Sequence, residues 1–396
     1  MTFKDLPKGT WLIRLARSTY GKWVCRHYKL SIENRSLLDE IDGPFLLLAN
    51  HTHIIDYIFI SCLFPFHIRW VAGAHLFKKR FVRLIVKKYA QCISKEQGRS
   101  DISTVMEMKK VLKGGSPVGL FPEGTRTWDG STAMDDEQYL LMAKLIRYLK
   151  VPVLFVNNKG GFACKPRWRE MEADGPVTIS LRAFVRPEEY LDMPIPDLKE
   201  LIRTDFFFSN DEWQNEARIP YYCSKGAEGL QRVLYICPVC HKLGTHVTDG
   251  NTMTCSSCGA VTTMDEFQML KSSSTHFSTI RQWHEWEQSQ LRSDTVKFEK
   301  EEGVLFQIGD IDGYQTVSEK IMVSADSEKI TVECLDVDRH SFHLMFSEIS
   351  SIVITLKQTM ELFIGTTLYR IRLNPDGSAL KYSELHQALR QHVPVG

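Results

Sequence analysis

Residues 45–56 read Phe-Leu-Leu-Leu-Ala-Asn-His-Thr-His-Ile-Ile-Asp, and this stretch decides the fold. Its first five residues are apolar and follow the chain-breaking pair Gly43-Pro44, a length and a flank that favour a buried strand. From Asn50 onward the residues leave this strand and enter a predicted helix. A buried strand that ends in polar residues before a helix is typical of an α/β sheet domain.

Two further apolar runs extend this pattern. Residues 118–121 come after a Gly-Gly pair and a proline, and residues 151–156 form the third run. Helical patterns lie between the runs, at residues 102–113 and 134–150. Strands that alternate with helices predict an α/β fold with a mostly parallel sheet flanked by helices.

The end of the first predicted strand carries a histidine and an aspartate. In parallel sheets, ligands gather at the carboxyl ends of the strands. A helical turn can bring the Asp56 carboxylate back to the His51 imidazole, which fixes the tautomer and leaves the other ring nitrogen to take a proton from a hydroxyl. His53 is a second candidate base, and a packed histidine with an incidental neighbour is the alternative interpretation.

The second apolar run leads into Phe-Pro-Glu-Gly-Thr-Arg at residues 121–126. Gly124 lets the backbone approach a ligand closely, and Arg126 offers a planar charged fork suited to a phosphate. Glu123 can hold that arginine or its loop in place. The string alone is explained by a simple turn, but together with the upstream histidine it predicts an anion site.

These motifs resemble those of a known family, the glycerolipid acyltransferases typified by lysophosphatidic acid acyltransferase. The first block of that family is a histidine and an aspartate separated by four residues, matched by His51 and Asp56. Its third block is matched by residues 121–126, and its fourth, a proline-bearing apolar strand, resembles residues 151–156. The resemblance covers residues 10–230 and implies the glycerolipid acyltransferase fold.

The second block of the family carries an arginine that holds the acceptor's phosphate. Here Lys95 takes that place, and Arg99 is its rival. Lysine binds a phosphate as a point charge, whereas arginine binds it with a fork. The resemblance implies substrate-binding roles for Lys95, Arg99, Glu123, Gly124, Thr125 and Arg126.

The resemblance also implies a reaction. His51, oriented by Asp56, deprotonates the free hydroxyl of a lysophospholipid, which attacks the thioester of acyl-CoA or acyl-carrier protein. Backbone N–H groups near Gly124 are candidate donors to the developing oxyanion. The implied acceptor is 1-acylglycerol-3-phosphate, which would make the product phosphatidic acid and the chain an enzyme of phospholipid biosynthesis.

Two other functions fit parts of the pattern. One is a non-catalytic protein that binds lipid or a partner on an acyltransferase platform. The other is acyl transfer to a different acceptor, such as a lyso-ornithine lipid, glycerol phosphate or a polyketide-like alcohol. His51, Asp56 and Arg126 are all present, and a platform would not need them, so we favour catalysis.

Four cysteines late in the chain form two Cys-x-x-Cys pairs with the spacing of a zinc ribbon. Four thiolates fill a tetrahedral site, so the predicted zinc is structural, and His241 and His246 are bystanders. A redox pair is the alternative interpretation. Because the module carries no basic cluster, we expect no nucleic acid partner. The predicted ligands are Cys237, Cys240, Cys255 and Cys258.

The order of these patterns predicts four parts. They are an acyltransferase domain with an N-terminal amphipathic helix at 1–231, a zinc ribbon at 232–265, a helical linker at 266–300 and a β-rich domain at 301–396. The last part shows seven short strand patterns and a terminal helix, and a pleckstrin-homology-like domain is one candidate for it.

Composition and charge bear on where the chain works. The content of 43% hydrophobic and 24% charged residues is that of a folded protein, and no run reaches the roughly 18–20 apolar residues of a membrane span. Residues 11–29 predict an interfacial amphipathic helix, while residues 78–88 fit either a basic membrane-surface helix or a core helix with a solvated edge. The polar start and scattered cysteines lead us to expect a cytoplasmic protein, peripheral at the inner face of a membrane.

Overall fold

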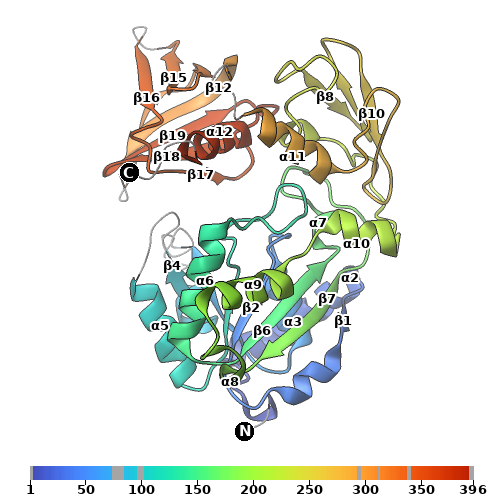
Figure 1. The fold of residues 1–396 in the computed structure, drawn as a ribbon, viewed down its shortest axis with the longest axis vertical. Coiled ribbons are helices and arrows are strands. Elements are labelled where there is room, and N and C mark those ends of the chain that lie inside the picture. The colour runs from blue at the N-terminus through green and yellow to red at the C-terminus, as the bar shows by residue number, and fades with distance from the viewer. Residues whose placement is uncertain are drawn as a thin grey trace. The chain divides into compact units, whose positions relative to one another are not determined.

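The computed structural model describes residues 3–73, 84–95, 102–291, 296–310, 313–336 and 340–391 (Figure 1). The chain divides into two compact units. Unit 1 comprises Met1–Arg167 and Glu172–Tyr222, and unit 2 comprises Trp168–Met171 and Cys223–Gly396. The finer division into a ribbon, a linker and a β-rich domain stays a prediction.

Unit 1 is built on a seven-stranded sheet in the order β1-β7-β6-β2-β5-β3-β4. Every neighbouring pair is parallel except β6 and β7, so the predicted mostly parallel sheet is confirmed. The three apolar runs form β2, β5 and β6. The strands are β1 (Ser31–Glu33), β2 (Leu46–Ala49), β3 (Arg69–Gly73), β4 (Ile93–Lys95), β5 (Val118–Leu120), β6 (Val153–Lys159) and β7 (Thr178–Val185).

Helices cover both faces of this sheet, which explains why its central strands are apolar throughout. Leu46 and Leu48 pack against one layer of helices, and each buried leucine contributes about 1.5–3 kcal/mol. That layer, in front of the sheet in Figure 1, consists of α5 (Ile102–Lys113), α6 (Asp136–Leu149) and α9 (Ile195–Phe206). On the other face lies α3 (Asp56–Leu63). There Gly119 is required, because a Cβ would lie 2.5 Å from the Trp70 ring.

The N-terminal helix packs beside α3 and contains one π-helical turn. Its parts are α1 (Trp11–Ala16), η2 (Arg17–Gly21) and α2 (Lys22–His27), close to the predicted helix at 11–29. Gly21 allows close packing, since a Cβ there would lie 3.0 Å from the Cys62 Sγ. The remaining elements of unit 1 are η1 (Phe3–Asp5), η3 (Arg35–Glu40), η5 (Leu84–Tyr89), α7 (Gly161–Cys164), α8 (Pro187–Tyr190) and α10 (Asn210–Ala217).

Unit 2 contains two antiparallel sheets. The first has the order β11-β10-β9-β8, and its strands are β8 (His246–Asp249), β9 (Thr252–Cys255), β10 (Val261–Met264) and β11 (Leu270–Ser272). The helix α11 (Ile280–Gln290) follows. Sequence patterns at residues 227–234 suggest a helix, but only the short 3-10 turn η6 (Leu230–Arg232) forms there, since Gly229 adopts a positive φ of 93° just before it.

The second sheet has eight strands in the order β16-β15-β14-β12-β19-β18-β17, with β13 paired to β12. The β-rich region ending in a helix is therefore confirmed, although β13 was not predicted. The elements are β12 (Phe298–Gly309), β13 (Tyr314–Ser318), β14 (Ile321–Ala325), β15 (Lys329–Cys334), β16 (Ser341–Met345), β17 (Ser351–Thr355), β18 (Thr359–Ile364), β19 (Thr367–Leu373) and α12 (Leu380–Gln391). Across the described ranges, none of the helices has the length and apolar character needed to cross a bilayer.

Candidate functional site

His51 and Asp56 meet at the carboxyl end of β2. The chain leaves β2 after Ala49, and α3 begins at Asp56, so a short turn folds the carboxylate back onto the ring. The His51 Nδ1 lies 2.8 Å from the Asp56 Oδ2. The Asp56 side chain is fully buried, whereas that of His51 is 22% exposed. The imidazole is thus held from the inside and open on the outside.

The Asp56 carboxylate is surrounded by donors. Its Oδ2 also accepts the backbone N–H groups of Thr52 at 2.6 Å and His53 at 2.8 Å. Its Oδ1 accepts the Thr52 hydroxyl at 3.4 Å and the Asn158 side-chain amide. Removing one hydrogen bond from a buried acceptor costs about 1–3 kcal/mol. These contacts fix the oxygen that faces the imidazole.

Asn158, on β6, was not predicted. Its backbone N–H donates to the Asn50 Oδ1 at 2.6 Å, and the Asn50 amide donates to the Asn158 carbonyl at 3.3 Å. This exchange joins the end of β2 to β6 and places the Asn158 side chain at Asp56. The only sequence signal is an asparagine following an apolar run, because its partners lie about a hundred residues away in the chain.

Aromatic stacking sets the plane of the His51 ring. The ring stacks on Phe121 with centroids 4.4 Å apart, and Phe121 stacks on Trp70 at 4.8 Å. The His51 N–H donates to the Glu123 Oε1 at 2.9 Å, and its carbonyl accepts the Thr127 N–H at 2.9 Å. With Nδ1 directed at Asp56, Nε2 is the remaining nitrogen, and no residue of the described ranges is hydrogen-bonded to it.

His53, the rival base, lies in the wrong environment. It is 2% exposed and packs against the rings of Tyr28 and Phe59. Its Nδ1 accepts the Ile55 N–H at 3.3 Å, and its Nε2 is buried without a hydrogen-bond partner among the described residues. Burial lowers its pKa to about 4. A substrate cannot reach this ring, so His51 is the better candidate for the general base.

The contacts of the loop after β5 add detail to the roles predicted for its residues. Glu123 was expected to hold Arg126 or the loop, and its carboxylate accepts the backbone N–H groups of His51 and, at 3.4 Å, Ala133. Burial raises the pKa of Glu123 to about 8. Gly124 is exposed with a φ of 70°, and its N–H donates to the Phe121 carbonyl at 3.1 Å, so that amide is committed to the turn.

Two arginines lie at this loop. Burial lowers the pKa of Arg126, while the charge of Asp56 opposes that shift. Arg167 was not predicted, since no motif surrounds it. It is 5% exposed, it donates to the Thr125 Oγ1, and it also donates to the Arg126 carbonyl at 3.4 Å. Its guanidinium carbon lies 4.4 Å from the centroid of the Trp128 ring.

Lys95 stands apart from this cluster. Lys95 ends β4, and the parallel strands β2, β5, β3 and β4 place it at the same edge of the sheet as His51. Three strand spacings separate β4 from β2, so Lys95 lies on the order of 14 Å along the edge and does not touch the dyad. Arg99 falls outside the described residues.

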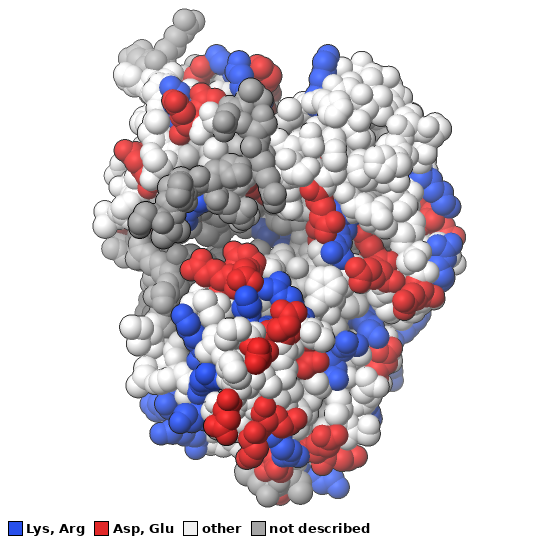
Figure 2. Space-filling model, in the orientation of Figure 1, with Lys and Arg blue, Asp and Glu red and all other residues white. Residues whose placement is uncertain are grey.

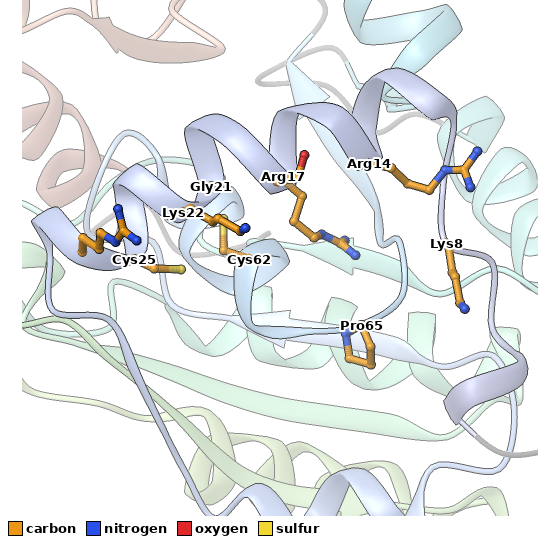
Figure 3. A pocket seen from close by; sticks show the side chains of 10 residues that line it. Lys8, Arg14, Arg17, Gly21, Lys22, Cys25, Cys62 and Pro65 are labelled. Carbon is orange, nitrogen blue, oxygen red and sulfur yellow. The ribbon is translucent and has the colours of Figure 1, made fainter.

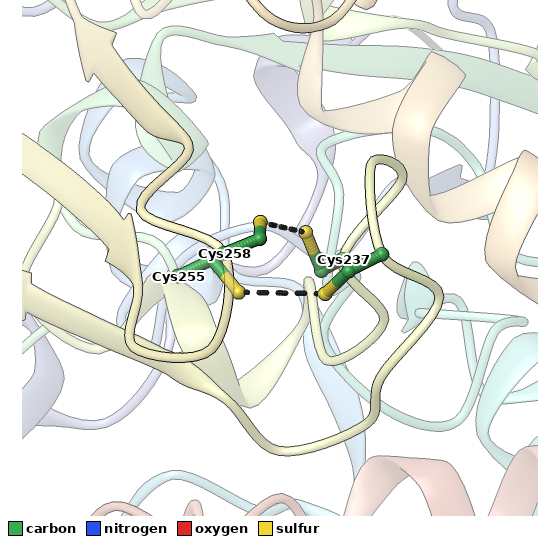
Figure 4. A group of neighbouring side chains, drawn as sticks. Cys237, Cys255 and Cys258 are labelled. Atoms are coloured by element: carbon green, nitrogen blue, oxygen red, sulfur yellow. Dashed lines mark hydrogen bonds between the residues drawn. The ribbon is translucent and has the colours of Figure 1, made fainter.

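In unit 2 the four cysteines come together (Figure 4). Their sulfur atoms all lie within 4.8 Å of one another, with the Sγ atoms of Cys237 and Cys258 3.7 Å apart and those of Cys240 and Cys255 3.8 Å apart. Four thiolates around a tetrahedral ion at about 2.3 Å would be about 3.8 Å apart. The cluster therefore fits a metal ion. His246 is outside it, with its Nδ1 2.7 Å from the Leu234 carbonyl.

Comparisons with known proteins agree with these motifs. Residues 29–156 match the family described as Acyltransferase. A 1-acyl-sn-glycerol-3-phosphate acyltransferase of Bacillus subtilis (strain 168) is 34% identical over 89 residues, 22% of this chain and 43% of that protein. One of Helicobacter pylori (strain J99) is 26% identical over 154 residues, 38% and 65% of the respective chains. Each match therefore spans less than two thirds of the curated relative.

Among solved structures, the chain is similar to the 1-acyl-sn-glycerophosphate (LPA) acyltransferase PlsC from Thermotoga maritima. The identity is 21%, the TM-score is 0.38, and the alignment covers 48% of this chain and 80% of that one.

Proposed function

Unit 1 belongs to the acyltransferase family, and we propose that it moves a fatty acyl group from a thioester onto the free hydroxyl of a lysophospholipid. The observation that carries this proposal is the His51–Asp56 pair. The contact between Nδ1 and Oδ2 is 2.8 Å, the carboxylate is buried, and the ring is open to solvent at the sheet edge. A general base needs this combination of fixed tautomer and access.

The reaction follows from that geometry. His51 Nε2 takes the proton of the acceptor hydroxyl, and the oxygen forms a bond with the thioester carbonyl carbon. The tetrahedral intermediate then collapses, the C–S bond breaks, and the imidazolium returns the proton to the leaving sulfur. Asp56 stabilises the imidazolium while it exists, as the carboxylate of a catalytic triad does. The acceptor is the nucleophile, so no serine or cysteine nucleophile is needed.

The loop after β5 supplies the groups for the charged parts of the substrates. The Gly124 amide is committed to its turn, but no described residue accepts from the Thr125 or Arg126 N–H, and these are our candidate oxyanion donors. Arg126 would bind the acceptor's phosphate with its fork. Lys95, at the same edge, and Arg99 are further candidates. We propose 1-acylglycerol-3-phosphate as acceptor and acyl-CoA or acyl-carrier protein as donor.

The test is turnover by the full chain with lysophosphatidate and acyl-CoA, with phosphatidate measured by mass spectrometry. Lyso-ornithine lipid and glycerol 3-phosphate serve as competing acceptors. We expect product from lysophosphatidate and none from the His51→Ala variant, with zinc content and circular dichroism unchanged. Product formation by that variant at the normal rate would remove His51 from its role, and binding without turnover by the wild type would indicate a platform.

In unit 2 we propose a structural zinc ion held by Cys237, Cys240, Cys255 and Cys258. The sulfur separations support it, because they match those of a tetrahedral four-thiolate site. When bound, the ion ties the loop at 237–240 to the turn between β9 and β10. Four protein ligands leave no position for a substrate, so the ion would have no part in acyl transfer.

We further propose that the N-terminal helix lies on a membrane surface. Its exposed large side chains follow one another at intervals of four, five and three residues, and the π turn lengthens the middle interval so that they share a face. Aromatic residues of this kind are enriched at membrane interfaces. The exposed residues are Trp11, Leu15, Tyr20 and Trp23.

Cations flank this face. The lining of a groove of about 500 Å³ beside Pro65 includes basic side chains, and Figure 3 shows Arg14 and Arg17 on the helix and Lys8 on the segment before it. On the face of unit 1 seen in Figure 2, the two signs of charge are interspersed, so attraction to anionic lipid would be local. In the second predicted basic segment, residues 78–83 lie outside the described ranges, and η5 exposes Leu84 and Ile85.

Vesicle sedimentation tests this surface. We expect the protein to bind several-fold more strongly to vesicles in which about one third of the lipid is anionic than to neutral vesicles. The double variant Trp11→Ala, Trp23→Ala should bind more weakly to both kinds of vesicle. Tyr222→Ala, which removes an exposed aromatic ring in unit 1 outside this helix, is the matched control. Equal binding by all variants would exclude the helix as the contact. A positive result would support a peripheral location at the inner face of a membrane.

A further inference from the structure

Arg167 is a buried arginine beside the proposed substrate loop, and neither the family motifs nor the family match at residues 29–156 includes it. Buried arginines are uncommon, because the charge must be taken out of water. Only 5% of this residue is exposed. Its position in unit 1, shortly after α7, brings it to a loop formed about forty residues earlier.

Three of its contacts fall on one stretch of that loop. The Nη1 atom donates to the Thr125 hydroxyl and, at 3.4 Å, to the Arg126 carbonyl, and the guanidinium lies 4.4 Å from the Trp128 ring centroid. A single side chain therefore touches a hydroxyl, a carbonyl and a ring within four residues. These contacts hold the loop on both sides of Arg126.

The charges explain why an arginine is used for this purpose. Burial and the like charge of Arg126 both lower the pKa of Arg167, to about 9, so the group remains a cation at neutral pH. Two cations held close together repel each other, and an anion bound beside them relieves that repulsion. A phosphomonoester carries nearly two negative charges at neutral pH, while a phosphodiester carries one. The monoester gains more from this pair.

We infer that Arg167 is a positioning residue that holds Thr125 and Arg126 so that the loop binds a phosphomonoester head group in preference to a phosphodiester. The inference rests on the proposed function and narrows it, because it names the residue that would select the acceptor. Arg167 touches no reacting atom in this scheme. It acts through the loop, and its effect should appear in acceptor binding rather than in the chemical step.

The experiment compares steady-state constants for lysophosphatidate, a monoester, and lysophosphatidylglycerol, a diester. We expect Arg167→Lys, which keeps the charge but loses the fork, to raise KM for lysophosphatidate about tenfold and to leave kcat within about threefold. The KM for acyl-CoA should not change, and the preference for the monoester should fall about tenfold. Arg203→Lys is the matched control, since Arg203 also stacks on a ring, that of Tyr139 at 4.5 Å.

A second variant guards against misfolding. Thr125 is exposed, so Thr125→Val removes the acceptor of the Arg167 hydrogen bond without opening a buried site. It should raise KM in the same way, and the double variant should be no worse than Arg167→Lys alone. Additive effects would overturn the inference. So would an unchanged KM, or a fall in kcat that accompanies a lower melting temperature with KM unchanged.

Failure of the proposed function would be visible separately. If the wild type shows no turnover, the enzyme proposal falls, and calorimetric titration with glycerol 3-phosphate still tests the loop. We then expect about tenfold weaker binding by Arg167→Lys than by the wild type and by Arg203→Lys. Equal binding by all three proteins would overturn the role of Arg167.

Discussion

Among the described residues, two buried carboxylates are paired with a histidine, one in each unit, and the two histidines differ in their exposure to solvent. His51 and Asp56 are 2.8 Å apart, and His284 and Glu384 are 2.7 Å apart. In the first pair the histidine side chain is 22% exposed, whereas in the second it is 5% exposed. The same contact can therefore belong to a reaction site or to a core. What separates the two pairs is the exposure of the imidazole to solvent.

The second pair has the surroundings of a structural cluster. Glu384, on α12, also accepts the Tyr235 hydroxyl at 2.6 Å and the Gln288 amide at 2.8 Å. Glu287, on α11, accepts the Ile236 N–H at 2.6 Å, and burial raises its pKa well above the usual range. Side chains from α11 and α12 thus hold the chain just before Cys237. We interpret this cluster as the connection between the cysteine site and the last sheet.

Removing the metal should give the largest effect and should sharpen the division between the units. Structural zinc contributes about 10–16 kcal/mol to small modules, so Cys237→Ser or a strong chelator should unfold the ribbon. We expect zinc loss by atomic absorption and faster proteolysis in unit 2, with acyl transfer by unit 1 kept within about threefold. Cys223→Ser, outside the cluster, is the control. Loss of transfer on chelation would break the division.

Neutralising Asp56 should abolish most of the activity, whereas neutralising Glu384 should leave the activity almost unchanged. Asp56→Asn can no longer stabilise the imidazolium or fix the tautomer, so we expect transfer to fall about a thousandfold or more. Glu384→Gln should leave transfer within about threefold. Turnover with lysophosphatidate measures both, and circular dichroism checks the fold. A similar loss in the two variants would show that access does not distinguish the pairs.

Stability should separate the buried Glu384 pair from an exposed ion pair of the same unit. Truncating one partner of a buried pair costs about 3–5 kcal/mol, so Glu384→Ala should lower the free energy of unfolding of unit 2 by about 3 kcal/mol. Urea unfolding followed by tryptophan fluorescence measures it, since Trp283 is buried on α11. Glu333→Ala breaks the exposed pair with Lys300 and should cost less than about 1 kcal/mol. Equal costs would mean that the Glu384 cluster is not structural.

Part of the fold and part of the candidate site could be predicted from the sequence, for physical reasons. The strands β2, β5 and β6 could be predicted from runs of apolar residues, because a strand that is covered by helices on both faces consists mostly of apolar residues. The His51–Asp56 contact follows from spacing, since a local turn joins the two residues. Asn158 and Arg167 could not be found in that way, because their partners come from segments brought together only by the sheet and its loops.

The last prediction concerns pH and the histidine beside the site. His53 is neutral in the fold, with a pKa of about 4 against about 6.5 when unfolded, because burial disfavours its charged form. Between these values the unfolded chain binds the extra proton, so stability is present above pH 6.5 and is lost as the pH falls toward 4. The shift corresponds to about 3 kcal/mol.

Burial also lowers the pKa of His67, which adds to the dependence of the wild type's stability on pH. The informative quantity is therefore the difference in stability loss between the wild type and a variant that lacks His53. We expect His53→Leu to lose about 3 kcal/mol less than the wild type between pH 7 and pH 4, measured by urea unfolding. Equal losses would mean that the ring is reached by water, and His53 would again compete with His51 as the base.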